Sequence, residues 1–225
     1  MTEADKIEIH GPHANCNARA TLTKQSKGER TRARLLEASA AEFASRGFHD
    51  TKVSDIVARA GLTQPSFYLY FANKEAAYDE LVAIFRRRLR DLVSANRFPE
   101  DQDMRPDQIR LRIHHATHTI FEAFDQDRNL TEIGFFQCPL AEEIKTEYAC
   151  MIAGNILEDQ QRGLLRRDIP AELLAQFIVG MVERIIRMKV GKKEREAHVD
   201  AMTAFIADGF HAGCERLACP SGPDA

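Results

Sequence analysis

The sequence predicts an all-α protein, with short helices near the N-terminus and a larger helical bundle after them. Apolar residues recur at helical spacing along most of the chain from Thr31 onward. Gly47 and Gly61 stand where helices should end, and Pro139 and Pro170 separate later helical stretches. With 225 residues, the chain is long enough for one large or two small domains with a substantial core.

The N-terminal region predicts an arm followed by one helix. Residues 1–26 show no hydrophobic periodicity and contain Gly11-Pro12, so we expect a disordered arm without an apolar secretion segment. Residues 31–46 carry apolar and small side chains at helical spacing. Gly47 is expected to cap this helix in the left-handed conformation, with Phe48 packing back on it.

Two short helices are then expected to meet across a tight turn. Residues 53–60 form an amphipathic segment, and Gly61 supplies the left-handed turn that ends it. Thr63 is placed to accept a hydrogen bond from a free N–H of the next helix, where Pro65 needs no donor. This arrangement is the helix-turn-helix pattern. The second helix presents polar groups without an acidic residue, which suits a phosphate-lined groove: Gln64, Ser66, Tyr68 and Tyr70.

From about Thr31 to Leu81 the chain resembles the TetR family of transcriptional regulators. The resemblance is carried by an ordered set of motifs: Arg46-Gly47-Phe48, Thr51 with Ile56 and Ala58, Ala60-Gly61-Leu62-Thr63, Tyr68, Phe71 and Lys74-Glu75. It implies a three-helix DNA-binding domain and a C-terminal helical bundle for ligand binding and dimerisation. Pro65 and Leu69-Tyr70 depart from residues common in the family, which bears on the target sequence more than on the activity.

The recognition helix offers candidates for base-edge and phosphate contacts. The N-terminal residues of this helix reach base edges in the motif class, which singles out Gln64, Pro65 and Ser66. Glutamine can pair with adenine, and a proline ring can contact a thymine methyl group. The resemblance assigns Tyr68 and Tyr70 to phosphates, because the matching positions of the family donate there.

Further DNA contacts are expected outside the recognition helix. Thr51 is placed to cap the second helix and to offer its hydroxyl to phosphate, and Lys74 to anchor phosphate as a cation. Lys24, Lys27 and Arg30 can touch backbone phosphates or reach a minor groove; for the arm before Lys24, a solvated tail is the alternative interpretation. The complete expected DNA-binding set is Lys24, Lys27, Arg30, Thr51, Thr63, Gln64, Pro65, Ser66, Tyr68, Leu69, Tyr70 and Lys74.

The charge distribution agrees with DNA contact at one end of the molecule. The net charge is -3, which excludes a general polyanion binder. Residues 19–75 nevertheless carry ten Lys or Arg against six Asp or Glu, whereas residues 76–225 carry twenty against twenty-five. A basic N-terminal third on an acidic remainder is what a chain needs if only one end meets phosphate. No apolar run approaches the roughly 18–20 residues of a membrane span.

The rest of the chain predicts a helical bundle. After a fourth helix over residues 74–94, we expect helices near 107–127, 130–137, 140–164, 170–189 and 195–215. The expected domain organisation is a disordered N-terminal arm (1–26), a helix-turn-helix DNA-binding domain (27–73), an effector-binding and dimerisation domain (74–216) and a disordered tail (217–225).

The bundle is expected to hold an effector and a second copy of the chain. Aromatic and pliable residues on its first helices suit a mostly apolar small-molecule effector, although such a stripe is more often plain core. The proposed effector contacts are His118, Phe121, Phe124, Phe136, Tyr148, Met151 and Ile152. The resemblance also implies a four-helix dimer interface, which would bury Phe177, Met181, Ile185, Phe205 and Phe210.

One cluster hints at different chemistry. His114, His118 and Glu122 are spaced four residues apart, so one helix face can offer two imidazoles and a carboxylate to a metal. The zinc-protease pattern would need Glu where His115 stands, and no phosphate loop or nucleophile elbow is present. Ligand hydrogen bonding and ordinary surface histidines are the other interpretations. We therefore expect no catalytic residue, no metal and no cofactor.

Together these observations predict a cytoplasmic, ligand-responsive regulator of transcription. Five scattered cysteines without C-x-x-C spacing indicate free thiols in a reducing compartment, with a redox sensor as the alternative. The expected protein is a homodimeric repressor that binds a palindromic operator in double-stranded DNA and is released by its effector. A palindrome fits a dimer whose recognition helices lie roughly 34–36 Å apart. The alternatives are an activator and a metal-binding helical-bundle enzyme using His114, His118 and Glu122.

Overall fold

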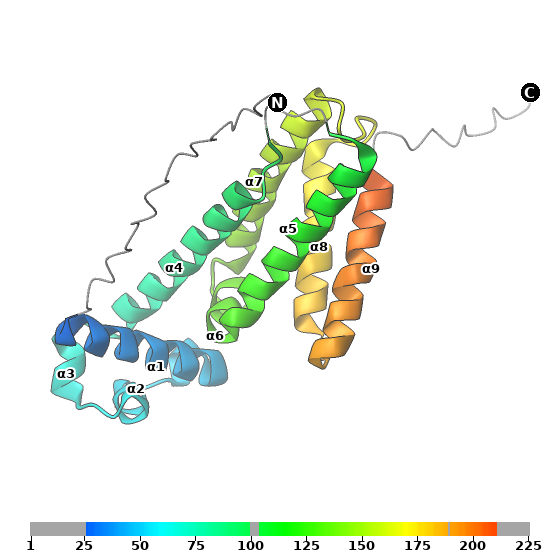
Figure 1. Cartoon of the computed structure of the whole chain (residues 1–225). Helices are drawn as coiled ribbons and strands as arrows, with labels where there is room; N and C mark the ends of the chain where they lie inside the picture. Colours follow the sequence, from blue (N-terminus) through cyan, green and yellow to red (C-terminus); the bar gives the residue numbers. More distant parts are fainter. Residues whose placement is uncertain (1–25, 100–103, 189, 211–225) are drawn as a thin grey trace, which may run out of the picture.

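The computed structural model describes residues 26–99, 104–188 and 190–210, and its regular elements are all helical (Figure 1). The all-α prediction is confirmed. A small head of three helices lies at one end of α4, and the remaining helices pack alongside α4 as a bundle. The elements are α1 (Lys27–Asp50), α2 (Val53–Ala60), α3 (Gln64–Tyr68), α4 (Lys74–Ala95), α5 (Pro106–Gln126), α6 (Arg128–Glu132), the π-helix η1 (Ile133–Gln137), α7 (Ala141–Gln161), α8 (Ala171–Arg187) and α9 (Lys192–Phe210).

Helix α1 begins earlier and ends later than the apolar spacing predicted. Ser26 and Glu29 form a reciprocal capping box, in which each side chain accepts a hydrogen bond from the other residue's backbone N–H. Gly47 does adopt the expected left-handed conformation, with φ of 79°. This non-helical residue interrupts α1 at a kink, and a short helical stretch follows it as far as Asp50.

The core of the head also includes the first turns of α4. Phe43, Ile56 and Phe67, from α1, α2 and α3, are fully buried. The ring of Tyr78, on α4, meets Phe43 edge-on with ring centroids 5.2 Å apart. Consequently α3 packs on a core that is shared by α1, α2 and the first turns of α4.

A short irregular stretch joins the head to the bundle. The helix expected over residues 130–137 is α6 followed by the five-residue π-helix η1. A Cβ on Gly134 would lie 2.1 Å from Cδ1 of Phe85 on α4, so only glycine allows this approach. At the end of η1, the Gln137 side chain donates a 2.9 Å hydrogen bond to the carbonyl of Ala44 in α1.

The long helices of the bundle agree closely with the expected ones. Helices α5, α7, α8 and α9 are near the ranges that periodicity predicted, and α4 starts at the expected Lys74. Two cysteines lie in the described segments, and both are free thiols: Cys138 is buried and Cys150 is exposed. None of the described helices has the length and apolar character needed to cross a membrane.

Candidate DNA interface and effector cavity

The recognition helix α3 is a short, firmly anchored element with an exposed outer face. Phe67 is fully buried and Phe71, just after the helix, is 3% exposed; their rings lie 5.4 Å apart. Tyr68 and Leu69 point outward instead, with 55% and 79% of their surface exposed. The buried Phe67 and Phe71 therefore fix which side chains α3 presents to solvent. Tyr70, which follows the helix, is half-buried.

The start of α3 presents the expected base-edge candidates. Gln64 and Pro65 are exposed, and Ser66 is half-buried. Thr63 is the N-cap residue, but its side chain makes no capping bond, so that expectation is wrong. Its hydroxyl lies 3.0 Å from the Ser66 hydroxyl instead, which leaves the first N–H groups of α3 without a side-chain acceptor.

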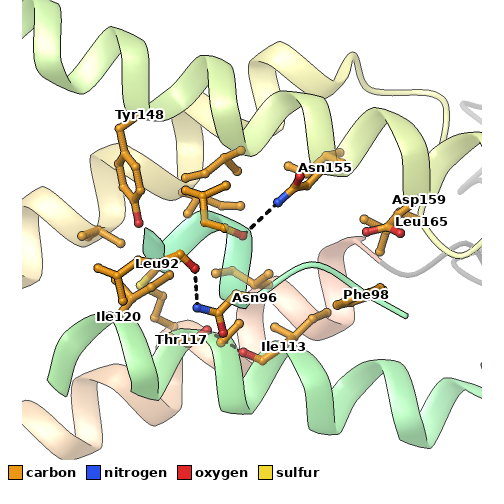
Figure 2. Close-up of a pocket in the computed structure, with 18 of the residues that line it drawn as sticks. Leu92, Asn96, Phe98, Ile113, Thr117, Ile120, Tyr148, Asn155, Asp159 and Leu165 are labelled. Atoms are coloured by element: carbon orange, nitrogen blue, oxygen red, sulfur yellow. Dashed lines mark hydrogen bonds between the residues drawn. The ribbon is translucent and has the colours of Figure 1, made fainter. Parts of the chain in front are cut away.

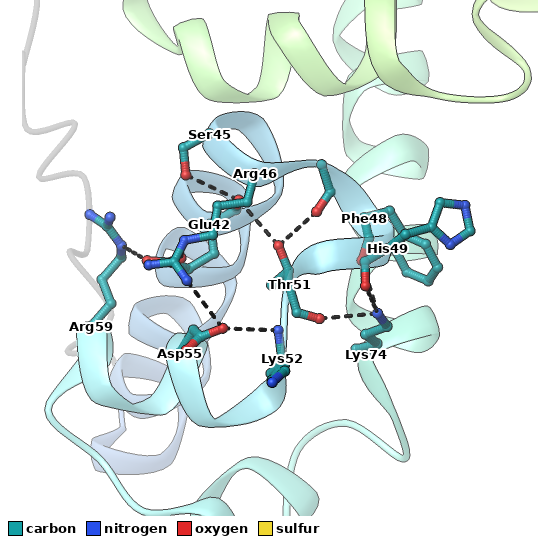
Figure 3. Close-up of polar contacts among 11 residues, drawn as sticks. Glu42, Ser45, Arg46, Phe48, His49, Thr51, Lys52, Asp55, Arg59 and Lys74 are labelled. Atoms are coloured by element: carbon teal, nitrogen blue, oxygen red, sulfur yellow. Dashed lines mark hydrogen bonds and ion pairs between the residues drawn. The ribbon is translucent and has the colours of Figure 1, made fainter.

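Thr51 is placed differently from the expectation. It is 1% exposed, and its hydroxyl donates to the carbonyl of Gly47 at 2.7 Å and lies 3.2 Å from that of Glu42 (Figure 3). The N-cap of α2 is the next residue, Lys52, which is exposed. A buried hydroxyl that is already bonded cannot donate to a phosphate, so Thr51 supports the α1–α2 connection from within.

Lys74 also has partners inside the head. Its ammonium group lies 2.9, 3.2 and 3.0 Å from the carbonyl oxygens of Phe48, His49 and Thr51 (Figure 3). It also stands 4.5 Å from the centre of the Phe48 ring. Since an ammonium has three donors, these carbonyls use its hydrogen-bonding capacity. The contacts tie the start of α4 to the α1–α2 connection and give Lys74 a structural role, whereas the expected phosphate contact stays a prediction.

Most other cations of the head are similarly engaged. Buried Glu42 receives Arg59 at 2.6 Å and Arg46 at 3.0 Å, an arrangement shown in Figure 3. Arg34 donates to the Ala60 carbonyl at 2.6 Å, and Arg32 pairs with Glu80 of α4. Within the described residues of the head, three exposed cations have neither an ion pair nor a side-chain hydrogen bond: Lys27, Arg30 and Lys52. Lys24 lies outside the described residues.

Lys52 is the candidate that sequence reasoning missed. It occupies the N-cap position of α2, where the helix leaves N–H groups that attract anions. The sequence could have indicated this candidate, because Lys52 follows Thr51 and directly precedes the amphipathic segment of α2.

The bundle contains an apolar cavity of about 130 Å³. Five helices contribute to its wall, as part of it in Figure 2 illustrates. The lining is Leu92 and Val93 of α4, Asn96 and Phe98 just after it, Ile113, Ala116, Thr117, Ile120 and Phe121 of α5, Tyr148, Ile152, Asn155, Ile156 and Asp159 of α7, Leu165 between α7 and α8, Ile178 and Val182 of α8, and Met202 and Ile206 of α9.

The few polar groups of the cavity differ in how they are satisfied. Asn96 donates to the Leu92 carbonyl at 2.8 Å and Asn155 to the Val93 carbonyl at 3.3 Å, both drawn in Figure 2. The Tyr148 hydroxyl is buried and has no hydrogen-bond partner, and burial raises the pKa of this phenol. Burial also raises the pKa of Asp159 to about 6, against the opposing effect of Arg162.

The expected effector contacts divide into two groups. Phe121, Tyr148 and Ile152 line the cavity. The other four do not: His118 faces α9, Phe124 packs among core rings, Phe136 lies under the Arg187 guanidinium, and Met151 lines a surface groove. Helical periodicity marks buried positions, but it does not separate a cavity wall from solid core.

The residues expected in a dimer interface lie on α8 and α9. Phe177 and Phe205 are 48% and 65% exposed, which is unusual for phenylalanine. Met181 is half-buried, and Ile185 is already buried within the chain. Phe210 ends α9, and its side chain lies outside the described part of the structure.

The histidine cluster has a different third member from the one expected. His118 lies 2.9 Å from Asp200 of α9, and His114 lies 3.8 Å from the same carboxylate oxygen. Glu122 is exposed on α5 and does not belong to this group. The carboxylate comes from a helix 82 residues away, so sequence spacing could not identify it.

An anchored helix-turn-helix head on a cavity-bearing helical bundle defines a one-component, DNA-binding transcriptional regulator. Comparison with known proteins agrees. Residues 35–81 match the model of the bacterial regulatory proteins of the tetR family. The HTH-type transcriptional regulator YdgC of Bacillus subtilis is 41% identical over 161 residues, which cover 72% of this chain and 82% of YdgC. The chain belongs to the TetR family.

Two further proteins are similar over most of the chain. The HTH-type transcriptional repressor DhaR of Mycobacterium sp. is 30% identical over 192 residues, covering 80% of this chain and 91% of DhaR. A solved gamma-butyrolactone receptor (an ArpA-like protein) shares the fold with a TM-score of 0.64 at 22% identity, covering 83% of this chain and 90% of that one. The names of the family and of these sequence relatives are those of regulators of transcription, not of enzymes.

Proposed function

We propose that this protein is a homodimeric transcriptional repressor that binds a palindromic operator through α3 and is released by a small, mostly apolar effector. The observation that carries the proposal is the exposed face of α3, which is held by two buried phenylalanines and free of acidic residues. Such a surface meets base edges and phosphates without repulsion. We place the protein in the cytoplasm. The free thiols of Cys138 and Cys150 agree with such a reducing compartment.

The side chains of the head suggest two kinds of DNA contact. Gln64, Pro65 and Ser66 would read base edges, because they lie at the N-terminal end of α3. The hydroxyls of Tyr68 and Tyr70 would donate to phosphates. The exposed cations Lys27, Arg30 and Lys52 would add sequence-independent attraction, and Lys24, outside the described residues, is proposed to do the same.

We assign residues 27–73 to the DNA-binding domain and residues 74–216 to the effector and dimerisation domain, between the arm at 1–26 and the tail at 217–225. The division falls where α3 gives way to α4. It is not a mechanical boundary, since Lys74 and Tyr78 of α4 are packed into the head. A displacement of α4 would therefore move the recognition helix.

The cavity supports an effector that is apolar with one hydrogen-bonding group. Its wall is almost entirely aliphatic and aromatic, while the buried Tyr148 hydroxyl offers a donor that no protein group uses. At about 130 Å³ it is smaller than the roughly 300–1,000 Å³ of sites for drug-sized ligands. A larger effector would have to push the surrounding helices apart.

This expansion offers a route from effector to DNA. Leu92 and Val93 line the cavity on the same helix whose first turns belong to the head. Gly134 packs η1 directly on α4, and Gln137 bonds η1 to α1. An effector that favours a displaced α4 would select a dimer whose recognition helices are wrongly spaced for the operator, and so would release it.

The outer face of α8 and α9 supplies a surface for the second copy. Leu173, Phe177 and Phe205 are between 45% and 65% exposed. No atoms outside its own helix lie within 4 Å of a Cβ built on Gly180, so a partner helix can approach closely there. Replacing Phe177 and Phe205 together by Glu should shift the protein from dimer to monomer in sedimentation velocity. The control Leu111→Glu, at an exposed position of α5, should leave the dimer intact.

Selection of bound sequences from random duplex DNA tests the proposal as a whole. The expected outcome is a palindrome whose half-sites are about one helical turn apart. Gln64→Ala should change the recovered sequence, whereas Tyr68→Phe should weaken binding to all sequences alike. Binding no stronger than that of an acidic bystander protein at low salt would refute DNA recognition, and transcription from the recovered operator would separate repression from activation.

A further inference from the structure

The outer side of the α5–α9 contact brings two imidazoles and one carboxylate together. His114 and His118 are one turn apart on α5, and their rings stack with centroids 4.3 Å apart and an interplanar angle of 22°. Nε2 of His118 lies 2.9 Å from Oδ1 of Asp200, and Nε2 of His114 lies 3.8 Å from the same atom. The possible ligand atoms of the three residues all lie within 4.8 Å of one another.

We propose that His114, His118 and Asp200 form a binding site for a divalent transition metal of the zinc class. Imidazole nitrogen and carboxylate oxygen are the ligands that zinc takes at about 2.0–2.1 Å. In a tetrahedral site, such bonds place neighbouring ligand atoms about 3.3 Å apart. The two measured separations from Asp200, 2.9 and 3.8 Å, lie on either side of that value, so only small rotations are needed.

The surroundings fit a three-ligand site open to solvent. His118 is half-buried and the other two groups are exposed, so a water molecule can complete the coordination shell. An ordinary ion pair needs only one of the two imidazoles. The stacking of the second ring beside the first, with its Nε2 turned to the same oxygen, is the feature that a simple His118–Asp200 pair leaves unexplained.

A metal at this place would clamp two helices that also enclose the cavity. Thr117 lies next to His118 and lines the cavity from α5, while Met202 lines it two residues after Asp200 on α9. Holding α5 and α9 together would oppose expansion of the cavity. Zinc should therefore raise the thermal midpoint of the protein and, where the proposed effector function holds, lower the affinity for the effector.

Equilibrium zinc binding to the full chain tests the site. One equivalent of Zn²⁺ should bind the wild type. Each of the substitutions His118→Ala, His114→Ala and Asp200→Ala should weaken the affinity for this equivalent at least ~10-fold. His115→Ala is the matched control, because His115 is exposed on the same helix but does not belong to the group, and it should keep this equivalent. Comparison within this set separates the site from the cysteines and from the histidines outside residues 114–118, which every variant retains.

Two further readouts decide the outcome. Co²⁺ should give the visible absorption of a four-coordinate site in the wild type and in His115→Ala, but not in Asp200→Ala. Equal zinc affinity in all variants, or equal loss in His115→Ala, would overturn the proposal and leave an ion pair only. Circular dichroism reports the fold of each variant, and Asp200→Asn is the conservative second choice. DNA affinity without metal should stay unchanged, so failure here would leave the proposed repressor function untouched.

Discussion

The DNA-binding head and the effector bundle differ in whether their buried polar groups have partners within the chain. In the head, buried Glu42 receives two arginines, the buried hydroxyl of Thr51 has a carbonyl partner, and Lys74 holds three carbonyls. In the bundle, the Tyr148 hydroxyl lies in the cavity wall without a partner, and Asp159 is buried at the cost of a raised pKa. The head pairs these groups within the chain, although Oε2 of Glu42 meets Arg46 as an ion pair without a hydrogen bond, whereas the bundle leaves the Tyr148 hydroxyl without any partner.

The difference indicates which region is rigid and which can change shape. A recognition helix of only five residues is not stable on its own, so packing against the rest of the head must position it. A cavity wall with an unused donor has something to gain when a ligand supplies an acceptor. We infer that the head is displaced as a unit, while the bundle deforms.

The largest effect should come from removing the anchor of the recognition helix. Phe67→Ala deletes a fully buried ring and should lower the free energy of unfolding by about 3–5 kcal/mol. Binding to every DNA sequence should fall with it. Leu69→Ala, at a position that is 79% exposed, is the control and should leave stability within about 0.5 kcal/mol of the wild type. Urea denaturation measures the free energy of unfolding of both variants. Similar losses of stability in the two would mean that the buried face of α3 does not hold the helix.

Lys74 and Lys52 should separate structural from phosphate-binding cations. Lys74→Met removes the ammonium that holds three carbonyls and should cost about 1–3 kcal/mol of stability, without changing the salt dependence of DNA binding. Lys52→Met should do the reverse, lowering the salt slope by about one unit for each lost phosphate contact. If instead Lys74→Met flattens the salt dependence at unchanged stability, the sequence-based phosphate role is right after all.

A smaller effect of opposite sign is expected in the cavity. Tyr148→Phe removes a buried hydroxyl that has no partner, so it should raise the free energy of unfolding by about 1 kcal/mol. The same variant should bind the effector more weakly, because it lacks the donor. Thermal denaturation and effector titration check the two parts. A clear loss of stability would show that the hydroxyl is already satisfied within the folded protein.

A change in pH dependence is expected at Asp159, in the same cavity wall. The pKa of Asp159 is about 6 in the folded chain against an ordinary value of 3.8, because burial disfavours the carboxylate. The folded state therefore binds this proton more tightly, and the resulting stability is full below pH 3.8 and lost as the pH rises through 6. Asp159→Asn should flatten stability between these values in urea titrations. A steeper decline in the variant would mean that the pairing with Arg162 outweighs burial.

Local signals predicted most of the helices and the helix-turn-helix motif. Glycine at residues 47 and 61 adopts positive φ as expected, because these positions need a backbone that other residues rarely take. Each long helix of the bundle was predicted close to its observed bounds, since its apolar face repeats along the chain itself. The capping box of Ser26 and Glu29 is an equally local signal that apolar spacing alone did not capture.

Side-chain roles were predicted less well wherever they depend on what lies opposite. Lys74 and Thr51 carry groups suited to phosphate, but the connection between α1 and α2 returns to α4 and occupies both. Phe124 and Tyr148 have the same aromatic, buried character in the sequence. Only the packing of five helices places Tyr148 at the cavity and Phe124 in solid core.

By itself, the sequence determined the class of protein: helix lengths, turn glycines and the order of motifs follow from neighbours along the chain and required no knowledge of the packing. The tertiary structure decided which polar groups are free. Asp200 reaches His118 from 82 residues away, and η1 meets both α1 and α4, through contacts that no local pattern encodes. Whether a donor binds DNA, ligand, metal or its own chain depends on which surfaces the fold brings within hydrogen-bonding distance.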